Sequence, residues 1–192
     1  MDKIKASDKK IAFIDIDGVL ADWPGGFLKW AGYDSLAQFK SQVDKKEQYR
    51  IKSEYRTCGV KATLDVLDGV RTFMKSACEK YNVVLLTARP YKKYFRIYSD
   101  TIKWLSDNNI CYDAIVFDEE KEKYIINNFD PAQVAFCVDD DISNANKLHD
   151  SGFKVYLKKN LGIYTQEALD RKLNDGIQIV NGNIIEVIHN EG

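Results

Sequence analysis

Short, largely apolar runs recur along the chain and are separated by longer stretches with helical spacing of apolar residues. The runs are IAFI at 11–14, VVLL at 83–86, AIVF at 114–117, VAFCV at 134–138 and FKVYL at 153–157. Continuous apolar runs, in place of strict alternation, are typical of parallel strands that are buried on both faces. The five runs are therefore expected to form a parallel sheet.

Four stretches between these runs carry apolar residues at the three- and four-residue spacing of amphipathic helices. They lie at 70–81, 98–109, 120–129 and 142–152. Strands that alternate with helices predict an α/β fold, here a Rossmann-like parallel sheet with helices on both faces.

Two segments break this alternation. Residues 23–62 contain no strand-like run and are rich in aromatic and charged residues, so we expect a small helical cap inserted after the first strand. The core would then comprise residues 1–22 and 63–160. In the remaining tail, 161–192, Asn181 and Gly182 stand between two β-prone runs, a pattern that predicts a β-hairpin.

Composition narrows the class of protein. The chain has 192 residues, of which 45% are hydrophobic and 30% charged, as expected for one globular core with a small insertion. Its 28 basic and 29 acidic residues nearly balance, so no overall charge favours a nucleic-acid or membrane partner. The four cysteines are scattered, and no apolar run approaches the roughly 18 residues of a membrane span. We expect a reduced, cytoplasmic protein.

Acids and a hydroxyl follow three of the predicted strands. Asp15 and Asp17 come after the first strand, Thr87 after the second, and the acidic triplet 139–141 after the fourth. Ligands of open parallel sheets bind beyond the carboxyl ends of the strands, so these groups should meet at one edge. Neighbouring carboxylates require a cation or a shared proton. Oxygen ligands of this kind suit Mg²⁺, which commonly binds one or two carboxylates together with a phosphate.

Four segments resemble, in order and spacing, the motifs of the haloacid dehalogenase superfamily of phosphohydrolases. They are DIDGVLAD at 15–22, VVLLTARP at 83–90, EEKEKYI at 119–125 and VAFCVDDDISNAN at 134–146. The resemblance implies that Asp15 is a nucleophile that forms an aspartyl-phosphate, and that Asp17 is the acid/base. It further implies that Thr87 holds phosphoryl oxygens. Mg²⁺ would be bound by Asp15, the Asp17 carbonyl and Asp139, with Asp140 alongside.

The acidic triplet leaves two assignments open. Either Asp139 and Asp140 or Asp140 and Asp141 can be the functional pair. We favour the first, because Asp139 directly follows the apolar run and places Asn144 at the usual D-D-x-x-x-N offset.

The phosphate-binding lysine also has two candidates. Lys121 is favoured, because Tyr124 and Ile125 follow it three and four residues on and supply the apolar pair such a helix needs. Lys123 remains the alternative.

The presence of Asp17 argues against a true dehalogenase, which lacks an acid at that place, and favours phosphoryl transfer. The layout resembles the 5′(3′)-deoxyribonucleotidase-like branch and the phosphatase domain of polynucleotide kinase-phosphatases. It implies a Mg²⁺-dependent phosphomonoester hydrolase that acts on a nucleotide or another small phosphomonoester. A 3′-phosphatase acting on nucleic-acid ends is the alternative, and a phosphomutase or a non-catalytic binding module fits less well.

Several residues are expected to contact substrate. Trp23 and Trp30 in the insertion offer aromatic faces for a base. Ala88 and Arg89 follow Thr87, and Asn144 follows the acidic triplet; Arg89 could equally pair with an acid. From residue 24 to residue 62 the chain has eight basic and four acidic residues, which favours an anionic substrate.

Overall fold

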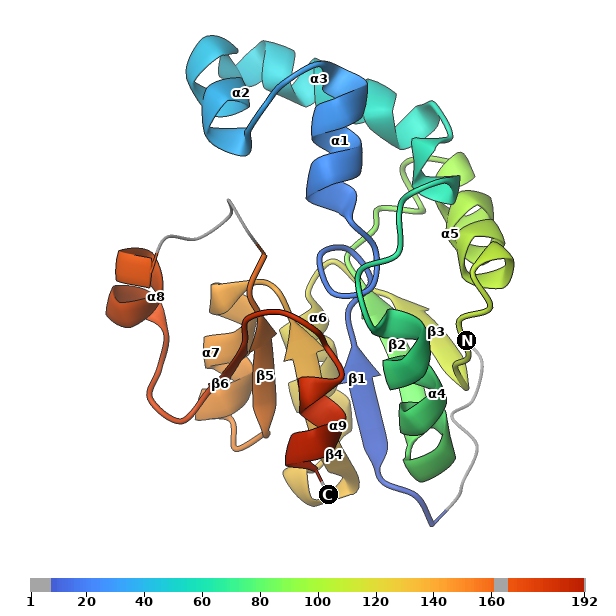
Figure 1. Cartoon of the computed structure of the whole chain (residues 1–192), viewed down its shortest axis with the longest axis vertical. Helices are drawn as coiled ribbons and strands as arrows, with labels where there is room; N and C mark the ends of the chain where they lie inside the picture. The colour runs from blue at the N-terminus through green and yellow to red at the C-terminus, as the bar shows by residue number, and fades with distance from the viewer. Residues whose placement is uncertain (1–7, 161–165, 192) are drawn as a thin grey trace.

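Six parallel strands form one sheet in the order β3-β2-β1-β4-β5-β6 in a computed structural model that describes residues 8–160 and 166–191 (Figure 1). The strands are β1 Ile11–Ile14, β2 Asn82–Thr87, β3 Ala114–Phe117, β4 Val134–Asp139, β5 Val155–Lys158 and β6 Gln178–Val180. The predicted α/β fold and its five strands are confirmed. β6, which pairs in parallel with β5, was not predicted as part of the sheet.

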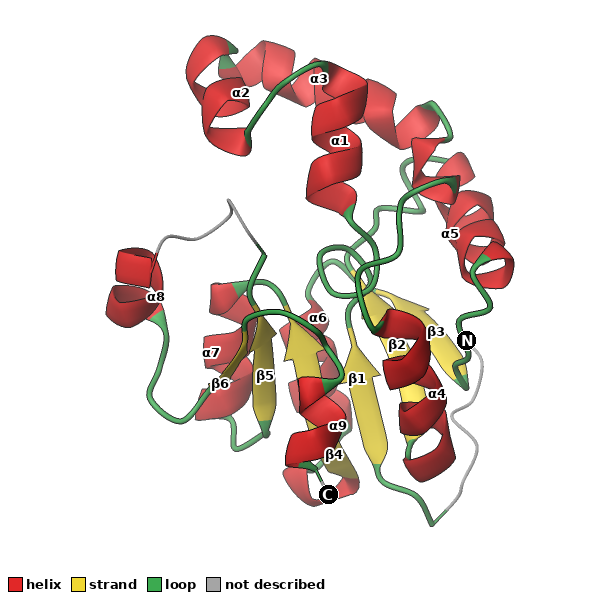
Figure 2. Cartoon of the chain, viewed as in Figure 1, coloured by secondary structure: helices red, strands yellow, loops and turns green. Residues whose placement is uncertain are grey.

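The helices fill the intervals between strands and the segment after β1 (Figure 2). They are α1 Trp23–Ala31, α2 Leu36–Gln42, α3 Lys45–Thr57, η1 Val60–Ala62, α4 Val70–Lys80, α5 Arg96–Asp107, α6 Lys121–Asn128, η2 Pro131–Gln133, α7 Ile142–Asp150, α8 Gln166–Lys172 and α9 Glu186–Asn190. The four predicted helices correspond to α4 to α7. Within the described ranges, no helix has the length and apolar character needed to cross a membrane.

Alternate residues of the strands face two separate hydrophobic cores. Ala12 and Ile14 of β1 pack in the core that α4, α5 and α9 complete, whereas Ile11 and Phe13 face the core beneath α6 and α7. β1 is therefore covered on both sides, which explains why its apolar run is continuous.

The insert after β1 folds as three helices, α1 to α3, and lies beyond the carboxyl ends of the strands (Figure 1). Its own small core is aromatic: the Phe27 ring packs edge-to-face on Phe39 and Tyr55, with ring centroids 5.1 and 5.2 Å apart. Asp22 starts α1 by accepting a hydrogen bond from the Gly25 amide at 3.0 Å, so the insert begins directly after the turn that follows β1.

The predicted β-hairpin in the tail is wrong. Residues 178–180 form β6, but the second β-prone run forms helix α9 instead of a returning strand. Ile184, Val187 and Ile188 have helical spacing and are buried in the core that α4 shares. Burial of this face against α4 outweighs the local turn preference of Asn181 and Gly182.

Candidate active site

Asp15 lies at the point where β1 leaves the sheet. Its backbone amide donates to the Val138 carbonyl at 3.0 Å, so pairing with β4 continues up to this residue. Its side-chain Oδ1 accepts a hydrogen bond from the Ile16 amide at 2.7 Å, and the residue is only 6% exposed. The carboxylate is therefore fixed in place at the carboxyl edge of the sheet.

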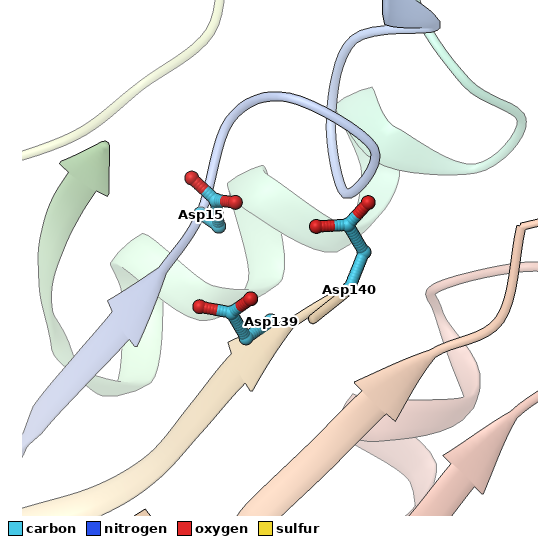
Figure 3. A group of neighbouring side chains, drawn as sticks. All are labelled: Asp15, Asp139 and Asp140. Atoms are coloured by element: carbon cyan, nitrogen blue, oxygen red, sulfur yellow. The ribbon is translucent and has the colours of Figure 1, made fainter. Parts of the chain in front are cut away.

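Three carboxylates converge at this edge. Oxygens of Asp15, Asp139 and Asp140 lie within 4.8 Å of one another, and Figure 3 shows the side chains pointing toward a shared space from the ends of β1 and β4. Burial raises the pKa of Asp15 to about 7, against the opposing effect of the Lys121 ammonium, and burial also raises the pKa of Asp140. Buried carboxylates that repel one another fit a divalent cation with oxygen ligands.

Lys121 is the cation that the fold brings to these acids. Lys121 is the first residue of α6 and is buried. Its Nζ lies 2.7 Å from Asp15 Oδ2 and 2.8 Å from Asp139 Oδ2. Burial alone would lower the pKa of Lys121, but the two carboxylates raise it above its ordinary value, so the lysine is charged. Lys123 instead lies on the exposed side of α6 and pairs with Glu120.

The acidic triplet divides into two environments. Asp141 caps α7 by accepting from the Asn144 amide at 3.0 Å, whereas Asp139 and Asp140 face Asp15. Asn144 Nδ2 lies 3.4 Å from Asp139 Oδ2, so this side chain orients a carboxylate of the cluster. Asn160, which the sequence interpretation did not identify, donates to Asp140 Oδ2 at 3.1 Å.

Gly18 makes room for Asp140. Its φ is +86°, and a Cβ built on it would lie 2.0 Å from Asp140 Oδ2. Any side chain at this position would both strain the backbone and displace the carboxylate. This explains the glycine that follows the two acids after β1.

Asp17 is held between two cations. Arg89 Nη2 lies 2.5 Å from Asp17 Oδ1, and Lys61 donates a hydrogen bond to Asp17 Oδ2. Arg89 is itself anchored on α5 by donating to the Thr101 hydroxyl at 2.8 Å. Burial alone would raise the pKa of Asp17, but the Arg89 guanidinium and the Lys61 ammonium hold it well below its usual range.

Lys61 contacts Asp17, although the sequence predicted it only as one of the basic residues of the insert. It lies in η1 and is 6% exposed, and burial lowers its pKa to about 8. Its ammonium also lies 5.9 Å from the Trp23 ring centroid and 5.6 Å from that of Tyr55. No local pattern sets Lys61 apart from the other lysines of the insert.

A cavity of about 190 Å³ separates the insert from the ends of the strands. The core lines it with Asp15, Asp17, Thr87, Ala88, Arg89 and Pro90, and the insert with Trp23, Phe27, Lys52, Tyr55, Arg56 and Lys61. Trp30 is not among the lining residues; it packs on Tyr55 with ring centroids 5.5 Å apart. The fold therefore brings an aromatic wall and several cations to the two carboxylates that follow β1.

No protein-family model and no curated protein matches the sequence. The structure is similar to that of a predicted phosphatase from Clostridium acetobutylicum (TM-score 0.66, 16% identity, 96% of this chain and 98% of that chain). A haloacid dehalogenase-like family hydrolase from Streptococcus pneumoniae is also similar (TM-score 0.64, 14% identity, 96% and 99%). So is D,D-heptose 1,7-bisphosphate phosphatase from B. bronchiseptica in complex with magnesium and phosphate (TM-score 0.58, 14% identity, 95% and 99%). The chain therefore has a haloacid dehalogenase-like fold with a helical insert after β1.

Proposed function

We propose that the chain is a Mg²⁺-dependent phosphomonoester hydrolase that acts through an aspartyl-phosphate on Asp15. The observation that carries this proposal is the convergence of Asp15, Asp139 and Asp140 beside a cavity, with Lys121 paired to the first two. Asp15, Asp139 and Asp140, together with the Asp17 carbonyl, would hold Mg²⁺. When bound, Mg²⁺ would neutralise charge on the phosphoryl group.

Asp15 acts as the nucleophile. A carboxylate oxygen of Asp15 attacks phosphorus, the bond from phosphorus to the substrate oxygen breaks, and the alcohol leaves with a proton. Water then attacks the phosphorus of the acyl phosphate, which releases inorganic phosphate and restores the carboxylate. Lys121, 2.7 Å from Asp15 Oδ2, supplies a fixed positive charge for the phosphoryl oxygens in both steps.

Asp17 transfers the protons. In the ligand-free chain its pairs with Arg89 and Lys61 keep it ionised, which is the form that accepts a proton from water in the second step. The first step requires the protonated form. A phosphate dianion entering the cavity competes for the two cations, and this weakens their hold on Asp17 and raises its pKa. Substrate binding thereby prepares the acid.

Thr87 and Ala88 form the phosphate side of the cavity. The Thr87 hydroxyl accepts a hydrogen bond from the Arg89 amide at 3.3 Å, which leaves its own proton for a phosphoryl oxygen. Asn144 acts on the metal side, where it orients Asp139.

The substrate is a small phosphomonoester, and a nucleotide is the specific candidate. Trp23 lines the same cavity as Thr87 and Ala88 and offers a face for a base. Trp30 has no part in this proposal because it packs within the insert. The layout that resembles deoxyribonucleotidases supports the same substrate class.

A 3′-phosphatase acting on nucleic-acid ends is the second candidate, and one surface favours it. Arg56, at the cavity, lies over the Tyr94 ring, and Lys93 contacts both Tyr94 and the exposed Tyr49. Cations interleaved with aromatic rings can bind a single strand. Phosphorylated oligonucleotides would then be hydrolysed much faster than mononucleotides, with an efficiency that falls steeply as salt rises.

The proposed activity is tested by hydrolysis of p-nitrophenyl phosphate with Mg²⁺ and with a chelator. We expect phosphate release that requires the metal. A screen of mononucleotides, sugar phosphates and 3′-phosphorylated oligonucleotides then separates the two candidates. A folded protein that releases no phosphate from any of these compounds would contradict the proposal.

A further inference from the structure

The charges around the cavity do not balance. Four of its lining residues are cationic and two are acidic. Lys61 and Arg89 are both engaged by Asp17, and Asp15 is engaged from outside the cavity by Lys121. The two remaining cations, Lys52 and Arg56, have no part in the chemistry described above.

Lys52 and Arg56 lie one turn apart on the same face of α3. Among residues 8–160 and 166–191, neither has a carboxylate within ion-pair distance. Their charged groups lie instead over aromatic rings, Lys52 5.8 Å from the Phe39 centroid and Arg56 5.5 Å from that of Tyr94. Burial lowers the pKa of Lys52, and the nearby Lys40 and Arg56 charges lower it further. An anion between these cations would relieve their repulsion.

Tyr55 provides an independent observation on the same helix face. It lines the cavity and is 3% exposed, and its hydroxyl is buried with no hydrogen-bond partner in the described part of the chain. Burial raises the pKa of this hydroxyl, so it remains a donor. A buried donor without a partner is costly, and a polar group of a ligand would satisfy it.

We infer that the α3 side of the cavity, formed by Lys52, Tyr55 and Arg56, is a second anion site. The substrate accordingly carries, besides the phosphate that reacts at Asp15, a carboxylate or second phosphate on a short carbon skeleton. The volume of about 190 Å³ supports a short skeleton, because pockets for larger ligands typically measure roughly 300–1,000 Å³. This inference rests on the proposed phosphatase activity, and within the class of small phosphomonoesters it favours a short-chain compound over a nucleotide.

Two compounds that differ only in the second anion test the inference. Glycerol 3-phosphate and 3-phosphoglycerate share a three-carbon skeleton. 3-Phosphoglycerate carries a carboxylate at the position where glycerol 3-phosphate carries a hydroxymethyl group. kcat/KM is measured for both with the wild-type chain and with Lys52→Met and Arg56→Met. Lys46→Met is the matched control, because Lys46 is an exposed lysine of the same helix outside the cavity.

We expect the wild-type chain and Lys46→Met to have a higher kcat/KM for 3-phosphoglycerate than for glycerol 3-phosphate. Lys52→Met and Arg56→Met should each lose about tenfold or more of that preference, as expected for the loss of a charge-assisted hydrogen bond. Equal kcat/KM for the two three-carbon compounds, or a preference that survives both substitutions, would overturn the inference while leaving the phosphatase proposal intact.

A binding measurement separates the two proposals. Calorimetric titration of both three-carbon compounds into Asp15→Asn with Mg²⁺ requires no turnover. Tighter binding of 3-phosphoglycerate, weakened about tenfold by adding Arg56→Met, supports the second anion site even if the wild-type chain hydrolyses nothing. Equal affinities for the two compounds would contradict it.

Discussion

Lys61 of the insert pairs with Asp17 of the core, across 44 residues of sequence and across the cavity. Lys61 is buried and Asp17 is half-buried, and Arg89, itself buried, holds the same carboxylate. The carboxylate that we propose as the acid/base is therefore joined to the insert directly. Any movement of the insert away from the sheet would change the charge environment of Asp17.

Replacing Lys61 by Met should destabilise the fold at neutral pH by about 1–3 kcal/mol, because Asp17 then loses one of the two cations that hold it. The two cations lower the pKa of Asp17 below its ordinary 3.8, so their stabilisation is present above that pH and is lost as the carboxylate is protonated. In urea unfolding, the difference in free energy of unfolding between wild type and Lys61→Met should become smaller below about pH 4. Exposed Lys46→Met is the control, with an expected change within about 0.5 kcal/mol. A Lys61→Met protein as stable as this control would refute the pairing.

Gly18→Ala should weaken Mg²⁺ binding by about tenfold or more, since its Cβ would lie 2.0 Å from Asp140 Oδ2 and displace that carboxylate. Gly32→Ala is a close control, because Gly32 has a similar φ of +76° but nothing within 4 Å of the added Cβ. Calorimetry with Mg²⁺ measures metal affinity, and urea unfolding measures the stability of the fold. Both variants should lose stability through backbone strain, and only the first should lose metal affinity. Equal metal affinities would exclude Asp140 from the site.

The stabilising effect of Mg²⁺ should grow as pH rises. Burial raises the pKa of Asp15 from 3.8 to about 7. In the absence of metal, the free energy of unfolding should therefore decrease as the pH rises between these two values, because the carboxylate ionises more readily in the unfolded chain. Mg²⁺ requires the ionised form and must displace the proton at low pH. The increase in Tm on adding Mg²⁺ should therefore be larger at about pH 8 than at about pH 5. The same increase at both pH values would show that Asp15 is not a ligand that titrates in this range.

The two lysines of α6 should differ sharply in their effect on turnover. Lys121→Met removes the buried charge beside Asp15 and should lower kcat by about 10²-fold or more. Lys123→Met removes an exposed lysine that pairs with Glu120 and should have little effect. Initial rates at saturating p-nitrophenyl phosphate and Mg²⁺ measure both. If Lys123→Met were the slow variant, the phosphate-binding role would pass to that residue.

The sheet was predictable because burial on both faces leaves a direct trace in the sequence. The runs 11–14 and 83–86 are continuously apolar, and both strands are packed between two cores. The meeting of Asp15 and Asp139 was predictable for a related reason, because adjacent parallel strands end at the same edge.

Contacts between segments that are distant in the sequence could not be predicted, because no local pattern indicates how those segments fold over the sheet. Lys61 reaches Asp17 only because α1 to α3 position η1 above β1, and no local spacing encodes that arrangement. Asn160 holds Asp140 from the segment beyond β5 for the same reason. The tail departs from the predicted hairpin because burial of Ile184, Val187 and Ile188 outweighs the turn preference of Asn181 and Gly182.

Asp15→Asn tests the central claim most directly. An amide cannot attack phosphorus, so Mg²⁺-dependent turnover should fall by at least ~10³-fold, the scale for removing a nucleophile. The variant should remain folded and, without metal, be no less stable than wild type, because burial already disfavours the charge on Asp15. Acid-quenched wild-type protein should carry a phosphoryl group on the peptide that contains Asp15, and the variant should carry none. Near-normal turnover by a folded Asp15→Asn protein would contradict the account.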